Sequence, residues 1–160
     1  MDKAKSMVDI INLLSKAIYI ASDAHKNQLD KAGKPYILHP IHLMNKLLYD
    51  TDLAIIAVLH DVVEDTHWTI EKLKDQGFSE RVIIALDLLT HKKEHSYEEY
   101  IDLICQNIDA ITVKRKDLEH NSDITRLKGV STKDLERIKK YHLAFVKLGA
   151  ARYNFNKITL

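Results

Sequence analysis

The sequence is poor in the residues that interrupt helices and in those that cross-link a chain. Its 160 residues include only four glycines, two prolines and one cysteine, Cys105. The single cysteine excludes an internal disulfide framework and suits a reducing compartment. No apolar stretch approaches the roughly 20 residues of a membrane helix, and residues 1–5 lack the apolar core of a signal peptide. We therefore expect a soluble, cytoplasmic protein with no membrane partner.

The charge of the chain is nearly balanced, with 24 Lys and Arg against 23 Asp and Glu and a formal net charge of +1. Nucleic-acid-binding proteins usually present a concentrated basic face, whereas the longest basic run here is Lys114-Arg115-Lys116. We expect no nucleic-acid partner, which leaves small anionic substrates open. The length suits one folding unit, residues 1–160, and leaves no room for a second catalytic domain.

Sparse glycine and proline, together with the hydrophobic spacing, predict an all-α fold. Helices are expected over about residues 5–26, 108–121 and 132–150, and another from Pro40, because proline is tolerated at the first helical position. Three more helix starts are marked by N-cap residues, the last with a capping box: Thr69, Ser79, and Ser96 with Glu99. No stretch alternates convincingly as a strand, so we predict a helical bundle without a sheet.

The most informative run is His60-Asp61-Val62-Val63-Glu64-Asp65, which follows a segment, 52–59, that is apolar on every side after its first residue. Such a segment is typical of a helix buried all round. If the helix continues, Asp61 and Asp65 stand one turn apart near its negative end, where each carboxylate is disfavoured by up to about 1 kcal/mol. A divalent metal held by His60 and Asp61 would offset these penalties. The alternative is a solvated helix end with ordinary surface acids.

Four blocks of the sequence, taken in order and at their spacing, point to one family. They are AHKNQ at 24–28, GKPYILHP at 33–40, LHDVVEDT at 59–66 and VKRKDLEHN at 113–121. In these blocks the chain resembles the hydrolase domain of the RelA/SpoT alarmone enzymes, a branch of the HD-domain phosphohydrolases, in its small stand-alone form. The resemblance covers about residues 15–148 and implies a single HD-type helical bundle.

The resemblance also implies a metal site, with the ligands His39, His60, Asp61 and Asp117. Two imidazoles and two carboxylates suit Mn²⁺, Fe²⁺ or Zn²⁺, and manganese is the usual metal of the family. Because His39 precedes Pro40, its backbone is biased toward an extended conformation, and we expect it at a helix entrance rather than inside a helix.

The residues alone leave ordinary alternatives for these ligands. His42 rivals His39, and either is readily explained as a structural histidine. Asp117 has an alternative role without metal, in which it forms an ion pair with Lys114 or Arg115 and only solvates its helix. The other histidines are expected to have structural or surface roles without metal: His67, His91, His95, His120 and His142.

The family removes pyrophosphate from the 3′ position of guanosine tetra- or pentaphosphate, which implies a metal-dependent hydrolase of a phosphorylated nucleotide that uses a metal-activated water. Glu64 and Asp65 are expected to be its acid/base pair. The residues expected to contact the substrate are Lys31, Asn121, Arg137 and Tyr141. The alternatives are a 5′-nucleotidase, another nucleotide or NADPH phosphatase with the same site, and a nucleotide-sensing module without turnover. The intact acid pair argues against the sensor.

Asp30 departs from the family pattern, which commonly has an arginine at this position. An acid there is expected to repel a polyanion if it faces the nucleotide, and to have little effect if it points to solvent. A second departure is the run Lys114-Arg115-Lys116 before Asp117, where an apolar residue and alanine are more common. Metal binding should survive this second change, whereas the purine preference is open. The physiological nucleotide, the ribose position attacked, the metal used in the cell, the oligomeric state and the biological role stay open.

Overall fold

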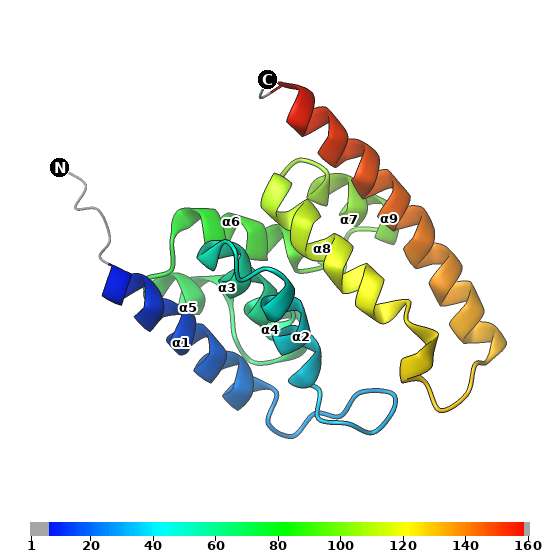
Figure 1. Cartoon of the computed structure of the whole chain (residues 1–160), viewed down its shortest axis with the longest axis horizontal. Helices are drawn as coiled ribbons and strands as arrows, with labels where there is room; N and C mark the ends of the chain where they lie inside the picture. Colours follow the sequence, from blue (N-terminus) through cyan, green and yellow to red (C-terminus); the bar gives the residue numbers. More distant parts are fainter. Residues whose placement is uncertain (1–6, 159–160) are drawn as a thin grey trace.

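A computed structural model describes residues 7–158, and their fold is helical throughout (Figure 1). The helices are α1 (Met7–Ala24), α2 (Leu38–Lys46), α3 (Thr51–Leu59), α4 (Val62–Asp65), α5 (Ile70–Asp75), α6 (Glu80–Leu89), α7 (Tyr97–Ile104), α8 (Ile108–Asn121), the 3₁₀ turn η1 (Ile124–Arg126) and α9 (Thr132–Ile158). Between residues 7 and 158 the only β pairing is an isolated bridge from Leu29 to Pro35. The predicted all-α fold is confirmed.

Helix α3 forms the centre of the core. All its residues from Leu53 to Leu59 are buried, and it packs against α1, α2, α6 and α8. Its burial on every side is the outcome that the continuous apolar pattern predicts. Because α3 ends inside the molecule, the side chains that follow it are placed among buried neighbours.

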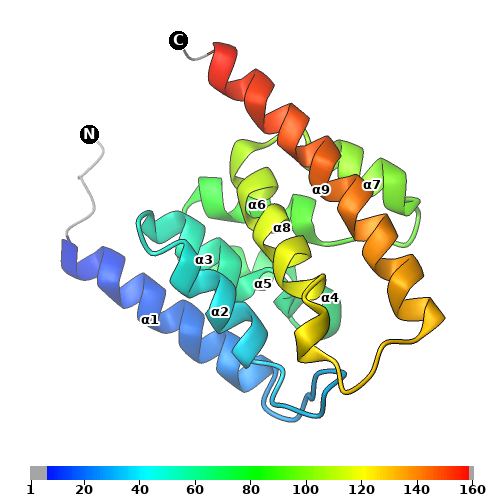
Figure 2. The same cartoon turned by 45° about the vertical axis from the view of Figure 1, so that its right-hand side comes forward.

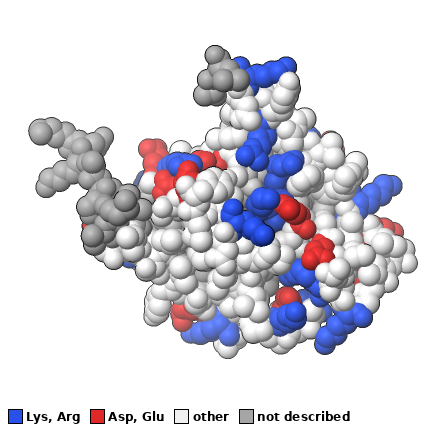
Figure 3. All heavy atoms as spheres, viewed as in Figure 1, with Lys and Arg blue, Asp and Glu red and all other residues white. Residues whose placement is uncertain are grey.

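The two longest later helices, α8 and α9, run beside each other in both views (Figures 1 and 2). The loop between α1 and α2 lies at the same end of the molecule as η1, and an ion pair between Asp30 and Arg126 joins them. All four sequence blocks come together: Gln28 donates to the Asp65 carbonyl, and His39, His60 and Asp117 lie side by side. On the face in Figure 3, Lys and Arg side chains are scattered among Asp and Glu rather than gathered in one continuous basic area.

The predicted helix starts agree with the structure where they depend on local chemistry. The hydroxyl of Thr69 accepts a hydrogen bond from the amide of Lys72, and that of Ser79 accepts one from Val82. Ser96 makes the predicted capping box with Glu99. The first helix also lies where it was predicted, although residues 5 and 6 fall outside the described residues. Side-chain oxygens at these positions satisfy amides that have no partner within the helix.

Two expectations for the other helices are wrong. Helix α2 begins at Leu38 rather than Pro40, so His39 lies inside its first turn and not at an extended entrance. The first turn tolerates Pro40, because amides there have no partner within the helix. Helix α9 continues to Ile158, beyond the predicted residue 150. The helix can extend this far because no glycine or proline follows Gly149 in the sequence.

The sequence left open whether the central helix continues through the His60-to-Asp65 run. It does not continue: α3 ends at Leu59 and the short α4 begins at Val62. The break is stabilised by the ring nitrogen Nδ1 of His60, which lies 2.8 Å from the carbonyl oxygen of Ala57, and by a bond from the Asp65 amide to the Asp61 carbonyl. Glu64 and Asp65 therefore belong to a separate turn and do not extend α3.

No helix among residues 7–158 is both long enough and apolar enough to cross a membrane.

Candidate metal centre and substrate cavity

Three buried side chains from three helical segments meet beside the end of α3. They are His39 of α2, His60 directly after α3, and Asp117 of α8, and they bring one ligand atom each within 4.8 Å of one another. Nε2 of His39 lies 3.1 Å from Oδ1 of Asp117, and Nε2 of His60 lies 3.8 Å from the same oxygen. Buried imidazoles beside a carboxylate are a common metal-binding arrangement.

The two imidazole nitrogens that face this cluster are otherwise unsatisfied. Nε2 of His39 and Nε2 of His60 are buried and have no hydrogen-bond partner among the residues described. Both approach carboxylate oxygens closely, but without the direction of a hydrogen bond. Because buried polar nitrogens normally have a partner, the donor set fits a metal ion, and the three residues can hold one.

Asp61 lies against this cluster rather than within it. Its Oδ2 is 2.8 Å from Nε2 of His60 and 3.8 Å from Nε2 of His39. The hydroxyl of Tyr36 donates a hydrogen bond to the same oxygen. Burial favours the neutral acid, but the neighbouring His60 brings the pKa of Asp61 down to about 2. Asp61 is thus a charged carboxylate beside both imidazoles, where a small shift would make it a fourth ligand.

The charges at this site depend strongly on one another. Burial opposes protonation of His60, yet the carboxylates of Asp61 and Asp117 raise its pKa to about 10. Burial also raises the pKa of Tyr36, with Asp61 adding to the effect, so the phenol keeps its proton and can donate it. Without a metal, positive charges on His60 and Lys114 balance these carboxylates. A divalent ion held by His60 would displace the proton of that imidazole.

Asp117 combines the two roles that the sequence left as alternatives. Its Oδ2 lies 2.8 Å from the ammonium of Lys114, while its Oδ1 faces the imidazoles and accepts a hydrogen bond from the amide of Asn121 at 2.6 Å. Burial would raise the pKa of Asp117, but Lys114 and the two histidines hold it well below its usual range. Arg115 instead donates to the Phe145 carbonyl on α9. One oxygen of Asp117 therefore remains directed at the cluster.

The proposed acid/base pair lies on α4 and is exposed. Oε2 of Glu64 accepts a hydrogen bond from the backbone amide of His91 at 2.9 Å. The backbone carbonyl of Asp65 accepts one from the side chain of Gln28, whose other end lies 2.7 Å from a ring nitrogen of His25. Partial burial, and then the charges of Asp61 and Glu64, raise the pKa of Asp65. The raised pKa makes Asp65 a better proton acceptor than an ordinary aspartate.

The four residues expected to contact substrate line a single cavity. Its volume is about 210 Å³, and it includes Lys31, Asn121, Arg137 and Tyr141. His39 and Tyr36 also line it, so the cavity reaches the metal cluster. Arg137 is held by an ion pair of 2.9 Å with Asp134, one turn earlier on α9.

Comparison with known proteins gives this arrangement a family context. No family model matches the chain. The bifunctional (p)ppGpp synthase/hydrolase SpoT of Escherichia coli K12 is 35% identical over 126 residues, which cover 71% of this chain and 18% of SpoT. The guanosine-3′,5′-bis(diphosphate) 3′-pyrophosphohydrolase of Haemophilus influenzae is 33% identical over 115 residues, covering 64% of this chain and 17% of that protein. This chain is similar in sequence to SpoT-type guanosine polyphosphate hydrolases.

The fold extends the likeness over nearly the whole molecule. A solved structure of a metazoan ortholog of SpoT, described as hydrolysing ppGpp and as having a role in starvation responses, superposes with a TM-score of 0.71 at 20% identity. The match covers 98% of this chain and 96% of that one. The chain spans less than a fifth of the length of the bacterial SpoT-type relatives, since it covers 18% and 17% of them.

The prediction for this chain missed the contact made by His120. Its Nδ1 lies 2.6 Å from Nδ1 of His39, and the two rings stack at 4.9 Å. Burial, and then the nearby Arg126, lower the pKa of His120 to about 4, so its ring is neutral and can accept a hydrogen bond. A proton on Nδ1 of His39 leaves the lone pair of Nε2 for a metal. One signal in the sequence pointed to His120: it follows Asp117 by three residues, and this spacing places the two side chains on one face of α8.

Asp30 does not point to solvent in this chain. Its Oδ1 accepts hydrogen bonds from the amides of Ala32 and Lys34, both at 2.9 Å, and its Oδ2 lies 3.6 Å from the guanidinium of Arg126. Burial alone would raise the pKa of Asp30, but these two amides and Arg126 hold it below its usual value. A guanidinium is therefore present at the cavity rim, supplied by η1 instead of by residue 30.

Proposed function

We propose that this chain hydrolyses a guanosine polyphosphate and removes the 3′-pyrophosphate with the help of a divalent metal. The observation that carries the proposal is the meeting of His39, His60 and Asp117 at a cavity lined by the residues expected to contact substrate. Sequence identity with SpoT-type hydrolases supports the same activity.

The proposed ligands are His39, His60 and Asp117, with Asp61 as the fourth. Manganese is the proposed metal, with Fe²⁺ or Zn²⁺ as alternatives, because the set mixes imidazole nitrogens with carboxylate oxygens. When bound, a divalent ion supplies a Lewis acid that polarises a phosphoryl oxygen and acidifies a bound water. The ammonium of Lys114, 2.8 Å from Asp117, reduces the negative charge of this set. We expect it to weaken metal binding without preventing it.

Proton transfer is assigned to Glu64 and Asp65. Partial burial and the charges of Asp61 and Glu64 raise the pKa of Asp65, which favours proton acceptance by this carboxylate. Glu64 uses one carboxylate oxygen to hold the amide of His91 and has the other free to orient a water. The two carboxylates would thus divide the work, with Glu64 positioning the nucleophile and Asp65 carrying its proton.

Substrate binding is assigned to the cavity of about 210 Å³. Lys31 and Arg137 would contact phosphate oxygens, and the Asp134 ion pair limits the motion of the Arg137 fork. Tyr141 would add a hydroxyl and a ring face. Asn121 already donates to Asp117, so we propose that it supports the ligand as well as lying toward the nucleotide.

A different phosphorylated nucleotide is the second candidate, and Asp30 is the observation that favours it. An acidic residue at the cavity rim disfavours the most highly charged substrates, even with Arg126 opposite it. A 5′-nucleotide or NADPH carries fewer phosphates than guanosine tetraphosphate. Either one would use the same metal and the same acid pair.

A substrate panel separates these candidates. Manganese-loaded protein is incubated with guanosine tetraphosphate, a set of 5′-mononucleotides and NADPH, and the released products are identified by phosphorus NMR. We expect pyrophosphate from guanosine tetraphosphate and none from an Asp117→Asn control at equal protein concentration. Release of orthophosphate from a mononucleotide or NADPH alone would assign the second function. Absence of product from every nucleotide would favour the sensing module.

A further inference from the structure

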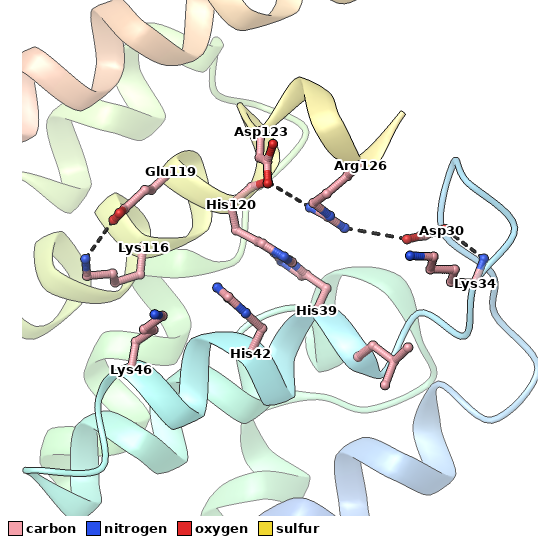
Figure 4. Close-up of a pocket in the computed structure, with 11 residues that line it drawn as sticks. Asp30, Lys34, His39, His42, Lys46, Lys116, Glu119, His120, Asp123 and Arg126 are labelled. Carbon is pink, nitrogen blue, oxygen red and sulfur yellow. Dashed lines mark hydrogen bonds and ion pairs between the residues drawn. The ribbon is translucent and has the colours of Figure 1, made fainter. Parts of the chain in front are cut away.

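A second and larger cavity lies between α2 and the C-terminal part of α8 (Figure 4). Its volume is about 500 Å³, within the range of roughly 300–1,000 Å³ that is usual for small-molecule sites. None of the four residues proposed to bind the nucleotide lines it. The two cavities share His39, Asp123 and the ion pair between Asp30 and Arg126. The proposed reaction assigns no role to Lys34, His42 or Lys46, which line only this second cavity.

The acidic side chains that line this cavity are already engaged. Glu119 forms an ion pair of 2.7 Å with Lys116, and Asp30 is bound by its own loop and Arg126. One oxygen of Asp123 accepts hydrogen bonds from the amide and hydroxyl of Thr125. The carboxylates are therefore committed to neighbours on η1, on α8 and in the loop before α2.

Two cations in the cavity have no such partner. Lys34, from the loop before α2, and Lys46, at the end of α2, form no ion pair with any residue between 7 and 158. Figure 4 shows their side chains on opposite sides of His42. Because the cavity walls bring both ammonium groups to one concave surface, their fields add within it.

The floor between the two lysines is a pair of stacked imidazoles. The rings of His42 and His120 lie 4.1 Å apart with an angle of 11° between their planes. Burial, and then the charge of Lys46, lower the pKa of His42, which is consistent with a positive field at this point. A neutral imidazole also offers one N–H donor. The cavity thus presents two ammonium groups and a neutral donor, beside carboxylates that are bonded to other groups.

We propose that this cavity is a second binding site for a small phosphorylated anion, held by Lys34, Lys46 and His42. The ordinary alternative is that the two lysines are solvated separately, as exposed lysines usually are. The shared cavity and the engaged acids favour the binding site. The chemical class is a molecule with a diphosphate or two phosphate groups, since such an anion matches two separate ammonium groups. The site exists independently of the proposed hydrolysis.

Calorimetric titration with inorganic pyrophosphate tests the proposal on the full chain at fixed metal content. Lys34→Gln and Lys46→Gln each remove one positive charge from the cavity. Each should weaken pyrophosphate binding roughly three- to tenfold, the scale expected for a partly exposed charge pair. The matched control is Lys93→Gln, which makes the same change at an exposed lysine outside the cavity. It should bind pyrophosphate like the wild type.

An Arg137→Gln variant distinguishes binding at the second cavity from binding at the nucleotide cavity, because Arg137 lines only the nucleotide cavity. We expect the binding event that depends on Lys34 and Lys46 to persist in this variant. Backbone amide shifts at residues 34, 42 and 46 should also move when pyrophosphate is added to it. Unchanged binding in both Lys34→Gln and Lys46→Gln, or complete loss of binding in Arg137→Gln, would overturn the second site.

Discussion

Replacing His120 with alanine should weaken metal binding without unfolding the chain. The ring of His120 holds Nδ1 of His39 at 2.6 Å, and His39 is only 3% exposed. Removing the acceptor leaves a buried N–H without a partner, which costs about 1–3 kcal/mol. It also lets the imidazole of His39 take the tautomer that places a proton on Nε2. Outer partners of metal-binding histidines typically change metal affinity by about 10- to 100-fold, and we expect a loss in that range.

Three variants make this prediction specific. His120→Asn keeps an acceptor oxygen near the position of Nδ1, so it should restore most of the lost affinity. His142→Asn removes an exposed histidine from α9 and should have no effect. Manganese affinity is measured by calorimetry for each variant, with thermal unfolding of the metal-free chains as a check on the fold. Equal metal affinity in the wild type and His120→Ala would refute the role of His120 in orienting His39.

Three further predictions concern the acid pair, the cavity rim and the stability of the core. Glu64→Gln should retain the metal while turnover falls by about 10² to 10⁴; metal analysis and kcat together test this, and loss of the metal would make Glu64 a ligand. Asp30→Asn keeps the oxygen that binds the loop amides but removes the negative charge. The kcat/KM for guanosine tetraphosphate should therefore rise about threefold or more. An unchanged kcat/KM would mean that Arg126 already neutralises Asp30. Arg81 donates to Asp109 at 2.7 Å and to Asp50 at 2.9 Å, and Arg81→Leu should lower the free energy of unfolding by about 1–2 kcal/mol, discounted for its partial exposure. Burial raises the pKa of Asp50, but Arg81 holds this pKa below its ordinary 3.8. The stabilisation by Arg81 is therefore present above pH 3.8 and is lost as the pH falls further. It would be contradicted if the free energy of unfolding fell by the same amount between pH 7 and pH 2.5 in the wild type and in Arg81→Leu.

The sequence predicts those parts of the fold that depend on neighbours along the chain. Thr69, Ser79 and the Ser96–Glu99 pair cap helices with their own side chains, so the signal and the structure are local. The burial of 53–59 likewise follows from a run that has no polar face. Whether α3 continues past Leu59 could not be predicted, because its end there depends on tertiary contacts more than on helix propensity. The break turns His60 and Asp61 toward side chains of α2 and α8.

The site shows the same division between local and tertiary information. The positions of His39 and Asp117 came from family resemblance, since neither residue has a local pattern that sets it apart from a structural histidine or a surface acid. The contact between His39 and His120 joins residues 81 positions apart. Helical spacing places His120 on the same face as Asp117, but it does not show that His39 lies opposite. The ion pair of Lys114 with Asp117 was foreseen as an alternative to the metal site, whereas the structure has both arrangements on the two oxygens of one carboxylate.

The most direct test of the central claim is the release of pyrophosphate from guanosine tetraphosphate before and after removal of the metal. The account predicts about one divalent ion per chain, loss of activity on chelation and recovery with manganese. The same measurement on His60→Ala should show neither bound metal nor activity at any manganese concentration that saturates the wild type. A metal-free preparation that releases pyrophosphate at the full rate would contradict the account.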